Sequence, residues 1–573
     1  METKRKKFDL LKSQLESERS SFVSHWRELS DYILPRRARF NLTDANKGDK
    51  KNRNIIDSTA SLAARTLRSG MMSGVTSPAR PWFRLTTPDP DMSEFGPVKS
   101  WLHIVQQRIS TSYLRSNLYN ILPVMYGDLG TFGTAPISVE EVFNGEVMHF
   151  KSFPIGSYMI AKDDYGKVNT FFREFRMTVS QLVETFGKYD PRTGKPIWDN
   201  FSTHVKNMYD QGNTQTWIDV CHVIMPNADY NPKVPLSKNK KFLSYYYESG
   251  TSYNLNFEVD QFLRPSGYDY FPILCPRWET TGEDVYGTSC PGMEALGDIK
   301  QLQHGEKRIM EAVDKMIRPP MTGPTSMKGV SASILPGDIT YVDGLNGQGF
   351  RPAHEVNFRI QEMEIKQQQV RSRIQRAFFE DLFLMLASSD RRQITAREIE
   401  ERHEEKLLAL GPVLEQLNQD LLDPLTDLVF DIHLRQGLIP PPPEELQGVD
   451  LKVEYISVMA QAQKALGVSG VERFAGFVGQ MAAVDPGVLD KVKGDQIVDV
   501  YADMLSVPPS IVRTDEEVEA IRGQRAQAQQ QAQQMQMIQA GAGVAKDLSQ
   551  AQVSEEDSAL SSLLKTANAG RIV

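Results

Sequence analysis

Cysteine is scarce in this chain of 573 residues, which carries 3 of them. Cys221, Cys275 and Cys290 are scattered along the sequence. A sparse and odd cysteine count argues against a disulfide framework and favours synthesis in a reducing cytosol. The core must therefore come from apolar burial, for which 40% hydrophobic residues are sufficient.

Long apolar runs are also missing. The chain has no stretch of about 18 or more apolar residues, which is the length that a membrane-spanning helix needs, so we expect no membrane span. Its basic start, Met1–Lys7, leads into a charged amphipathic segment. A signal peptide would instead have an apolar core and a small-residue cleavage site, so none is expected.

An excess of basic residues is the third absence, because the formal net charge is −8 at pH 7. Proteins that hold nucleic acid tightly usually carry a positive surplus, since phosphate contacts dominate their affinity. The charge therefore disfavours tight, static DNA binding. It leaves open a surface past which DNA slides.

Catalytic motifs are incomplete wherever they begin. No Gly-x-x-x-x-Gly-Lys-Ser/Thr phosphate loop occurs, so no ATP motor is expected. The segment Gly287–Gly292 resembles a nucleophile elbow, but its second glycine is one residue late. Leu407 stands where a zinc-binding helix starting at His403 needs its second histidine, and Tyr126–Asp128 lacks the second carboxylate of a two-metal site. We therefore predict no enzyme, no metal and no cofactor.

Helical periodicity is the strongest positive signal. Thr395–Glu398 has the spacing of a capping box, and apolar residues then recur every three or four positions from Leu407 to Ile432. At about 1.5 Å per residue this predicted helix over 395–436 is about 60 Å long, with bends at Pro412 and Pro424. The leucine stripe is most simply core packing. Further helices are predicted over 8–34, 58–72, 98–122, 291–318, 354–387, 451–466, 471–481 and 494–505.

The residue pattern changes between about 131 and 277, where short β-branched and aromatic runs alternate with turn residues. This pattern predicts a mostly β region with hairpins, including strands at 157–160, 216–225 and 241–248. Together with the helical periodicity it indicates an α+β fold that is mainly helical.

A Gly-, Pro- and Ser-rich insert, residues 319–352, lies between two predicted helices and holds one strand candidate at 338–342. If the flanking helices run antiparallel, the two ends of the insert must lie close together. At the other end of the chain, the tail at 511–573 is rich in Gln and Ala between Gly523 and Ala540, where it can form a polar helix or remain disordered. We expect the part beyond Gly541 to be poorly ordered.

Two groups of basic residues are candidate contacts for phosphate. Arg391 and Arg392 occupy a polar loop before the long helix, and they form either a solvated loop or a ring of guanidinium groups. The other group shares the polar face of 291–318 with acidic residues. That mixture of signs favours salt bridges between subunits over a pure DNA track. The members of this second group are Lys300, Lys307, Arg308 and Lys315.

Several short motifs occur in a particular order along the chain. They are Ser24–Leu29 with Tyr32–Pro35, Ser69–Gly74 running into Pro78–Phe83, Ser116–Tyr119, Gly130–Ala135, Pro276–Trp278 with Tyr286–Gly287, and Thr395–Glu398. Over residues 8–510 this set resembles the head-to-tail connecting (portal) proteins of short-tailed bacteriophages.

The resemblance implies a ring-forming portal fold with wing, stem, clip and crown. By position, these are the wing at 1–290, stem helices at 291–318 and 353–386 (the latter returning to the wing), the clip at 319–352, a tunnel loop at 387–394, a long wing helix at 395–443, the crown at 444–510 and the Gln/Ala-rich tail at 511–573. Arg391 and Arg392 match positions of the channel-facing tunnel loop.

The same resemblance implies a function. Twelve copies would form a ring at one capsid vertex, through which double-stranded DNA is packaged and later ejected. The implied partners are the terminase large subunit, tail adaptor proteins, and the major capsid and scaffolding proteins. The protein would assemble in the host cytoplasm and end in the virion. Because sliding requires weak contact that ignores base sequence, we expect contacts to phosphate alone.

Two other functions stay open at this point. A monomeric nucleic-acid enzyme would need a carboxylate pair or metal cluster, which the sequence does not offer. A non-channel helical scaffold, or another virion structural protein, would have the same helices without a ring.

Overall fold

The computed structural model describes residues 3–42, 53–89, 92–93, 95–143, 146–192, 194, 196–249, 261–318, 321–322, 351–352, 360–388, 410–446, 448, 451–456, 474–482, 485, 487, 491–504, 513 and 518–532. The chain forms two compact units, Met1–Leu466 and Gly467–Val573. Within the described part, no helix has the length and apolar character needed to cross a membrane.

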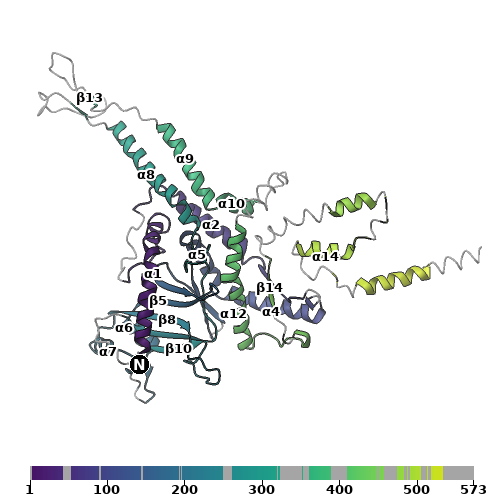
Figure 1. Cartoon of the computed structure of the whole chain (residues 1–573), viewed down its shortest axis with the longest axis horizontal. Coiled ribbons are helices and arrows are strands. Elements are labelled where there is room, and N and C mark those ends of the chain that lie inside the picture. Colours follow the sequence, from purple (N-terminus) through teal and green to yellow (C-terminus); the bar gives the residue numbers. More distant parts are fainter. Residues whose placement is uncertain are drawn as a thin grey trace, which may run out of the picture. The chain divides into compact units, whose positions relative to one another are not determined.

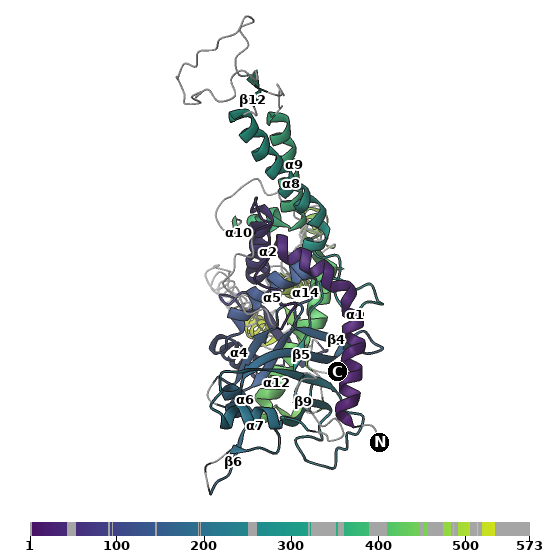
Figure 2. The ribbon, with the colours of Figure 1, turned by 90° about the vertical axis from the view of Figure 1, so that its left-hand side faces the viewer.

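The first unit combines long helices with antiparallel sheets, as Figures 1 and 2 show. Its α-helices are α1 (Lys4–Tyr32), α2 (Thr59–Val75), α4 (Gly96–Arg115), α5 (Leu118–Phe132), α6 (Val179–Phe186), α7 (Thr203–Asp210), α8 (Pro291–Ile317), α9 (Ile360–Ala377), α10 (Glu380–Ser388) and α12 (Asp423–Arg435). Residues 410–417 are also helical, followed by a π-helical turn η2 (Asn418–Leu422), and η3 (Glu444–Leu446) is a short 3-10 helix. This mixture confirms the predicted α+β class.

Two sheets form the β part of the first unit. The larger has the order β10-β9-β8-β5-β4, with β10 at Arg264–Tyr268, β9 at Phe242–Glu248, β8 at Trp217–Pro226, β5 at Val168–Thr178 and β4 at Tyr158–Lys162. The smaller has the order β11-β2-β3, with β11 at Ile273–Leu274, β2 at Ile137–Glu141 and β3 at Met148–Ser152. All pairs are antiparallel. The predicted mostly β region is therefore confirmed.

Three two-stranded pairs complete the sheets: β1 (Phe83–Thr86) with β14 (Lys452–Tyr455), β6 (Lys188–Tyr189) with β7 (Pro196–Ile197), and β12 (Met321–Thr322) with β13 (Arg351–Pro352). The β12–β13 pairing brings the two ends of the predicted insert together, as expected from antiparallel flanking helices. The strand candidate at 338–342 lies outside the described residues.

Helix α1 lies across one face of the five-stranded sheet (Figure 1). Phe8 and Leu15 of this helix pack with Tyr245 and Tyr247 of β9. Because side chains alternate along a strand, the neighbouring positions face the other way, and Phe171 of β5 joins the main core there. The larger sheet is thus covered on one face by α1 and packs by the other toward the small sheet.

The single helix predicted over 98–122 is wrong, because the chain breaks at Ser116–Asn117 and starts a second helix, α5. The Asn117 amide explains the break. Its Nδ2 donates to the Phe150 carbonyl at 2.8 Å, and its Oδ1 accepts from the Phe150 amide at 2.8 Å. A side chain that substitutes for a strand partner in this way is tied to β3 and cannot follow a continuous helix.

The helix predicted over 451–466 is also wrong in its described part, where β14 replaces it. Residues 452–455 pair with 83–86, and an ion pair joins Arg84 to Glu454 at 2.5 Å. The part of the chain predicted as the crown, residues 444–510, therefore begins inside the first unit. The boundary between the units lies after Leu466.

The long helix is irregular near its second proline. The amide of Asp423 donates to the carbonyl of Asn418, five residues back, which defines the π turn. Pro424 has no N–H, so the regular bond to the Asp420 carbonyl cannot form, and the widened turn precedes it. Leu410, Leu417 and Ile432 are buried, which confirms the stripe as core packing where it is described. The predicted capping box at 395–398 lies outside the described residues.

The second unit is helical where it is described. It contains α14 (Gly494–Met504) and helical stretches at 474–482 and 518–532. Arg522 pairs with Asp495 at 2.7 Å and so joins the last two helical stretches. The predicted helices at 471–481 and 494–505 are confirmed over these residues, and part of the Gln/Ala-rich segment is helical.

Candidate functional site

Helices α8 and α9 run side by side and extend together away from the sheets of the first unit (Figures 1 and 2). Ile299 and Leu302 on α8, with Val370 and Ile374 on α9, are buried in the main core. Gly305 allows a close approach, because a Cβ at that position would lie 1.7 Å from Nε2 of Gln367 on α9. The pair is thus packed tightly where it joins the rest of the unit.

A network of polar contacts fixes the inner end of the helix pair to the start of α2. Arg371 of α9 donates to Asp57 at 2.9 Å and to Glu306 of α8 at 2.5 Å. Gln303 of α8 accepts from the Asp57 amide at 2.8 Å. Burial alone would raise the pKa of Asp57, but hydrogen bonds from Thr59 and Arg371 lower it below its ordinary value. The carboxylate therefore stays charged and holds α9 through Arg371, while the backbone of Asp57 holds α8 through Gln303.

The four predicted basic residues of α8 fall into two groups. Lys300 is half-buried near the inner end and pairs with Glu28 of α1 at 2.7 Å. Lys307, Arg308 and Lys315 lie on the exposed outer half, where Arg308 contacts Glu311 at 3.0 Å. Lys300 thus joins α8 to α1 through a partly exposed ion pair. Lys307, Arg308 and Lys315 are exposed to a partner, and Arg308 is paired within α8 itself.

The outer half of α8 also exposes apolar side chains. Met310, Met316 and Ile317 are 58%, 51% and 71% exposed, and Ile365 of α9 is 62% exposed. Single exposed apolar side chains are common on proteins, but several of them beside basic residues on one half of a helix make that half a candidate for contact with another protein.

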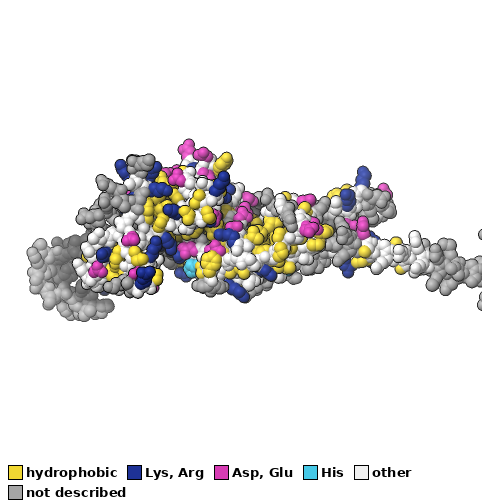
Figure 3. All heavy atoms as spheres, turned by 90° about the horizontal axis from the view of Figure 1, so that it is seen from below, with side chains coloured by type: hydrophobic (Ala, Val, Ile, Leu, Met, Phe, Trp, Pro, Cys, Tyr) yellow, Lys and Arg dark blue, Asp and Glu magenta, His cyan; other side chains and the backbone are white. Residues whose placement is uncertain are grey.

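Charges of both signs are also mixed elsewhere. On the face shown in Figure 3, the coloured basic and acidic side chains interleave with apolar ones over the described residues.

Arg391 and Arg392 lie outside the described residues, because the described segment that contains α10 ends at Ser388, the second residue of the predicted tunnel loop. The structure does describe the residues that lead into that loop. Phe379 has a left-handed backbone with φ of 54° between α9 and α10, so the chain turns there. Helix α10 then packs on α2, where a Cβ at Gly70 would lie 2.1 Å from Cγ of Phe383.

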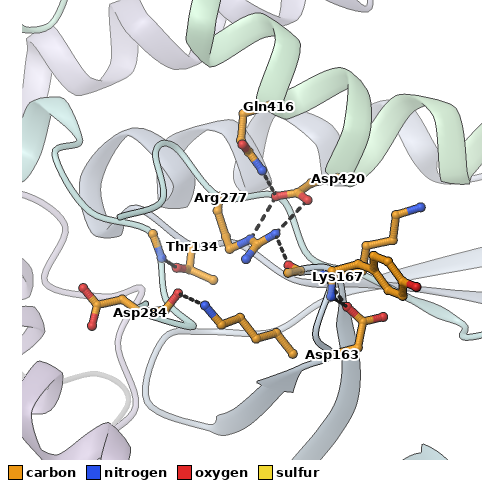
Figure 4. A network of polar contacts seen from close by, with 11 residues as sticks. Thr134, Asp163, Lys167, Arg277, Asp284, Gln416 and Asp420 are labelled. Atoms are coloured by element: carbon orange, nitrogen blue, oxygen red, sulfur yellow. Dashed lines mark hydrogen bonds and ion pairs between the residues drawn. The ribbon is translucent and has the colours of Figure 1, made fainter. Parts of the chain in front are cut away.

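A buried ion pair joins the long helix to the sheets. Arg277 donates from Nε to Oδ2 of Asp420 at 3.0 Å and from Nη2 to Oδ1 at 2.9 Å. The same Nη2 reaches the Gly166 carbonyl at 2.9 Å, and Gln416 donates to Asp420 at 2.9 Å. Figure 4 shows Arg277 pointing at Asp420 on the helix above it. Asp420 belongs to the π turn, so the irregular turn presents this carboxylate.

Burial alone would lower the pKa of Arg277, but the hydrogen bond and charge of Asp420 raise it. Sequence reasoning does not find this pair because its members are far apart in the chain. The available signals were the Pro276–Trp278 motif and Pro424 just after Asp420.

The incomplete catalytic motifs have structural uses. Asp128 lies in α5, is buried, and accepts from Nε of Arg37 at 2.9 Å. Cys290 is the N-cap residue immediately before α8, and its Sγ donates to the Thr131 carbonyl at 3.2 Å. Among the described residues no group of three or more His, Cys, Asp or Glu is arranged to hold a metal ion. His403 lies outside them.

The chain is similar to known phage proteins over nearly its whole length. The family model of the bacteriophage head to tail connecting protein matches residues 5–512. A portal protein of Salmonella phage epsilon15 is 48% identical over 558 residues, 97% of each chain. A probable portal protein of Bordetella phage BPP-1 is 44% identical over 546 residues, 95% of each chain. The chain therefore belongs to the family of bacteriophage head-to-tail connecting proteins.

Proposed function

We propose that this protein is a phage portal subunit, twelve copies of which form a ring around a channel for double-stranded DNA at one capsid vertex. The observation that carries the proposal is the near full-length similarity to two portal proteins. As a portal subunit the protein is a structural component of the virion, assembled in the host cytoplasm, and has no enzymatic role. The non-channel scaffold is the alternative that the experiments below must exclude.

The domain assignments follow from this proposal. Helices α8 and α9 are the stem, and the insert that begins and ends at the β12–β13 pair is the clip. The sheets with α1, α2, α4, α5 and α12 form the wing. In the second unit the helical stretches at 474–482 and 494–504 belong to the crown, and the one at 518–532 belongs to the Gln/Ala-rich tail. A stem that is anchored at its inner end by Asp57 and exposed along its outer half suits a wedge that packs against its neighbours.

DNA contact is proposed for two places. Lys307, Arg308 and Lys315 are exposed on the outer half of α8, and Arg391 and Arg392 belong to the tunnel loop. Since the chain is acidic overall, a few basic rings would centre the duplex while the rest of the channel repels it. Lys300 is left out of this role because its ion pair with Glu28 holds it against α1, whereas Arg308 pairs with Glu311 on its own exposed helix.

The partners proposed for the ring are the terminase large subunit and, after packaging, tail adaptor proteins. The clip is the proposed docking point for both. Capsid and scaffolding proteins would contact the ring during assembly. No phosphate loop occurs in the chain, so the energy for packaging must come from a separate ATPase.

Native mass spectrometry of the purified full-length protein tests the ring. A cyclic assembly of about twelve chain masses is expected, because head-to-tail contacts whose rotation closes generate a ring. A monomer or trimer would contradict the portal assignment and favour the scaffold.

The tunnel loop is tested by Arg391→Ala combined with Arg392→Ala. The double variant should form rings of unchanged mass but retain less DNA in packaged particles, because two cations that bind phosphate are removed from each subunit. If it fails to assemble, the loop is structural and the proposed contact with DNA is wrong.

A further inference from the structure

A cavity of about 640 Å³ lies between the five-stranded and the three-stranded sheets of the first unit. Its floor is a row of four residues, one from each neighbouring strand: Arg173 of β5, His222 of β8, Tyr246 of β9 and Arg264 of β10. Each is directly opposite the next in the strand register. Residues opposite one another share a face of the sheet, so all four side chains project toward the cavity.

Stacked rings hold this row in place. The His222 ring lies 3.7 Å from the Tyr246 ring at an interplanar angle of 8°. The Arg264 guanidinium carbon lies 4.9 Å from the centre of the same tyrosine ring. That of Arg173 lies 4.9 Å from the ring of Phe153 and 4.5 Å from that of Phe175. Stacking fixes the guanidinium planes and leaves their N–H edges to bind an acceptor.

The two arginines are the unbalanced charges of the cavity. Neither Arg173 nor Arg264 forms an ion pair with any residue in the part of the chain that the structure describes. The other cations at the cavity already have acidic partners: Lys151 with Glu140 at 2.7 Å, Lys240 with Asp269 at 2.7 Å, and Arg435 with Glu141 at 3.4 Å. A positive surplus has therefore collected in one cavity of a chain whose net charge is −8.

Two buried polar groups define what a ligand would meet in the cavity. Burial, together with the charges of Arg173 and Arg264, lowers the pKa of His222 well below its ordinary value, so the imidazole adds no charge. On the opposite wall, Ser138 of β2 is 4% exposed, and its Oγ has no hydrogen-bond partner among the described residues. A buried hydroxyl without a partner is uncommon in a protein interior, and a ligand acceptor would satisfy it.

We propose that this cavity binds the carboxylate of an acidic side chain, on a peptide segment of a protein partner that carries an apolar residue beside it. Arg173 and Arg264 would hold the carboxylate oxygens, and Ser138 would donate to one of them. The volume exceeds what a lone anion needs, since about 10–15 Å³ of such space is enough to hold one water molecule. Met177, Phe186 and Ile224 supply apolar walls for the neighbouring residue. This inference does not rest on the ring.

The probe is a library of acetylated, amidated hexapeptides with Asp or Glu at the third position and random residues elsewhere. A matched library carries Asn or Gln at that position. Both are passed over immobilised full-length protein, and retained peptides are identified by mass spectrometry. Retention of the acidic library should exceed that of the amide library at least about tenfold, with apolar residues enriched beside the acid.

Variants assign the binding to the cavity. Arg173→Gln and Arg264→Gln should each reduce retention at least about tenfold, because each removes one charged group that holds the carboxylate. Arg176→Gln is the matched control, since Arg176 lies on the same strand and pairs with Asp219 at 2.6 Å. It should retain the acidic peptides as the unchanged protein does. Thermal unfolding of all three variants checks that they are folded. If only one of the two cavity variants folds, that variant alone is sufficient to test the proposal.

Three results would overturn the proposal. They are equal retention of the two libraries, undiminished retention by a folded Arg173→Gln or Arg264→Gln variant, and no retention of either library. Inorganic phosphate is tested separately by calorimetry. Phosphate binding that depends on Arg173, without peptide retention, would identify a small-anion site and contradict the peptide proposal.

Discussion

The sheet-containing body of the first unit and the outer half of α8 use charge in opposite ways. In the body, Arg277 and Asp420 are buried and satisfy one another, with side-chain exposures of 5% and 11%. On the outer half of α8, Lys307 and Lys315 are exposed beside apolar residues such as Ile317. The body's charges stabilise the fold of the single chain, whereas those of α8 contribute little to it. Charges that the fold does not need are therefore the better candidates for binding a partner.

The largest expected effect comes from breaking the buried pair. Arg277→Gln leaves the Asp420 carboxylate buried without its partner, and we expect a loss of about 3–5 kcal/mol in the free energy of unfolding. Denaturant unfolding followed by circular dichroism measures it. Arg277→Lys should recover only part of the loss, because an ammonium cannot make the two parallel hydrogen bonds.

The control for this variant is a partly exposed pair in the same body. Arg176 and Asp219 have side-chain exposures of 28% and 32%, so Arg176→Gln should cost about 0–1 kcal/mol. Equal losses in the two variants would show that burial does not determine how much these ion pairs contribute to the free energy of unfolding.

A second comparison concerns two helical glycines. Gly70→Ala in α2 places a Cβ against the ring of Phe383, with Cγ at 2.1 Å, and should destabilise the unit by about 1–3 kcal/mol. Gly297→Ala in α8 meets no atom within 4 Å and should stabilise its helix by about 1 kcal/mol. Melting temperatures are expected to move in opposite directions, and a shift of the same sign would contradict the packing of α10 on α2.

The pH dependence of stability tests whether His222, which lines the cavity, is neutral in the folded protein. Burial lowers the pKa of His222 in the folded protein well below the ordinary value of 6.5. Below that pH the unfolded chain binds a proton that the folded protein does not. Stability is therefore lost as the pH falls from 6.5 toward the folded pKa, by about 1.4 kcal/mol per pH unit. His222→Gln should lose less stability between pH 7 and pH 5.5 than the unchanged protein, and an identical loss would show that His222 is protonated when folded.

The smallest effect on stability is expected on the outer half of α8. Changing Lys307, Arg308 and Lys315 together to Gln should alter the free energy of unfolding by no more than about 0.5 kcal/mol per site. Nonspecific DNA binding should nevertheless weaken, and its salt dependence should become shallower by about one unit for each phosphate that the variant no longer binds. Lys300→Gln is the matched control and should leave DNA binding unchanged. If Lys300→Gln weakens DNA binding and the triple variant does not, then Lys307, Arg308 and Lys315 are not the residues that bind DNA.

Local signals predict much of this fold. The periodicity of α1, α2 and α8 and the β-rich texture between 131 and 277 are sufficient, because helices and hairpins are encoded by nearby residues. The break before α5 is not visible in the sequence, since it depends on Asn117 meeting the backbone of Phe150. Strand β14 has a helix-like pattern in the sequence and becomes a strand because it pairs with β1, which lies far away in the chain.

The candidate sites are likewise divided between residues that the sequence identifies and contacts that only the tertiary structure shows. The basic residues of α8 are found from spacing, but only the structure separates Lys300, which pairs with Glu28, from the exposed three. The Arg277–Asp420 pair and the row of Arg173, His222, Tyr246 and Arg264 join distant segments through tertiary packing. The Pro276–Trp278 motif contains Arg277, but no short motif identifies its partner Asp420 or the row of four.

Electron microscopy of the purified assembly, viewed down its symmetry axis, tests the central claim most directly. We expect a closed ring of about twelve subunits with an open axial hole wide enough for duplex DNA, because a cyclic head-to-tail assembly leaves its axis free. A compact particle with a filled centre would contradict a channel, and the chain would then be a scaffold without a path for the genome.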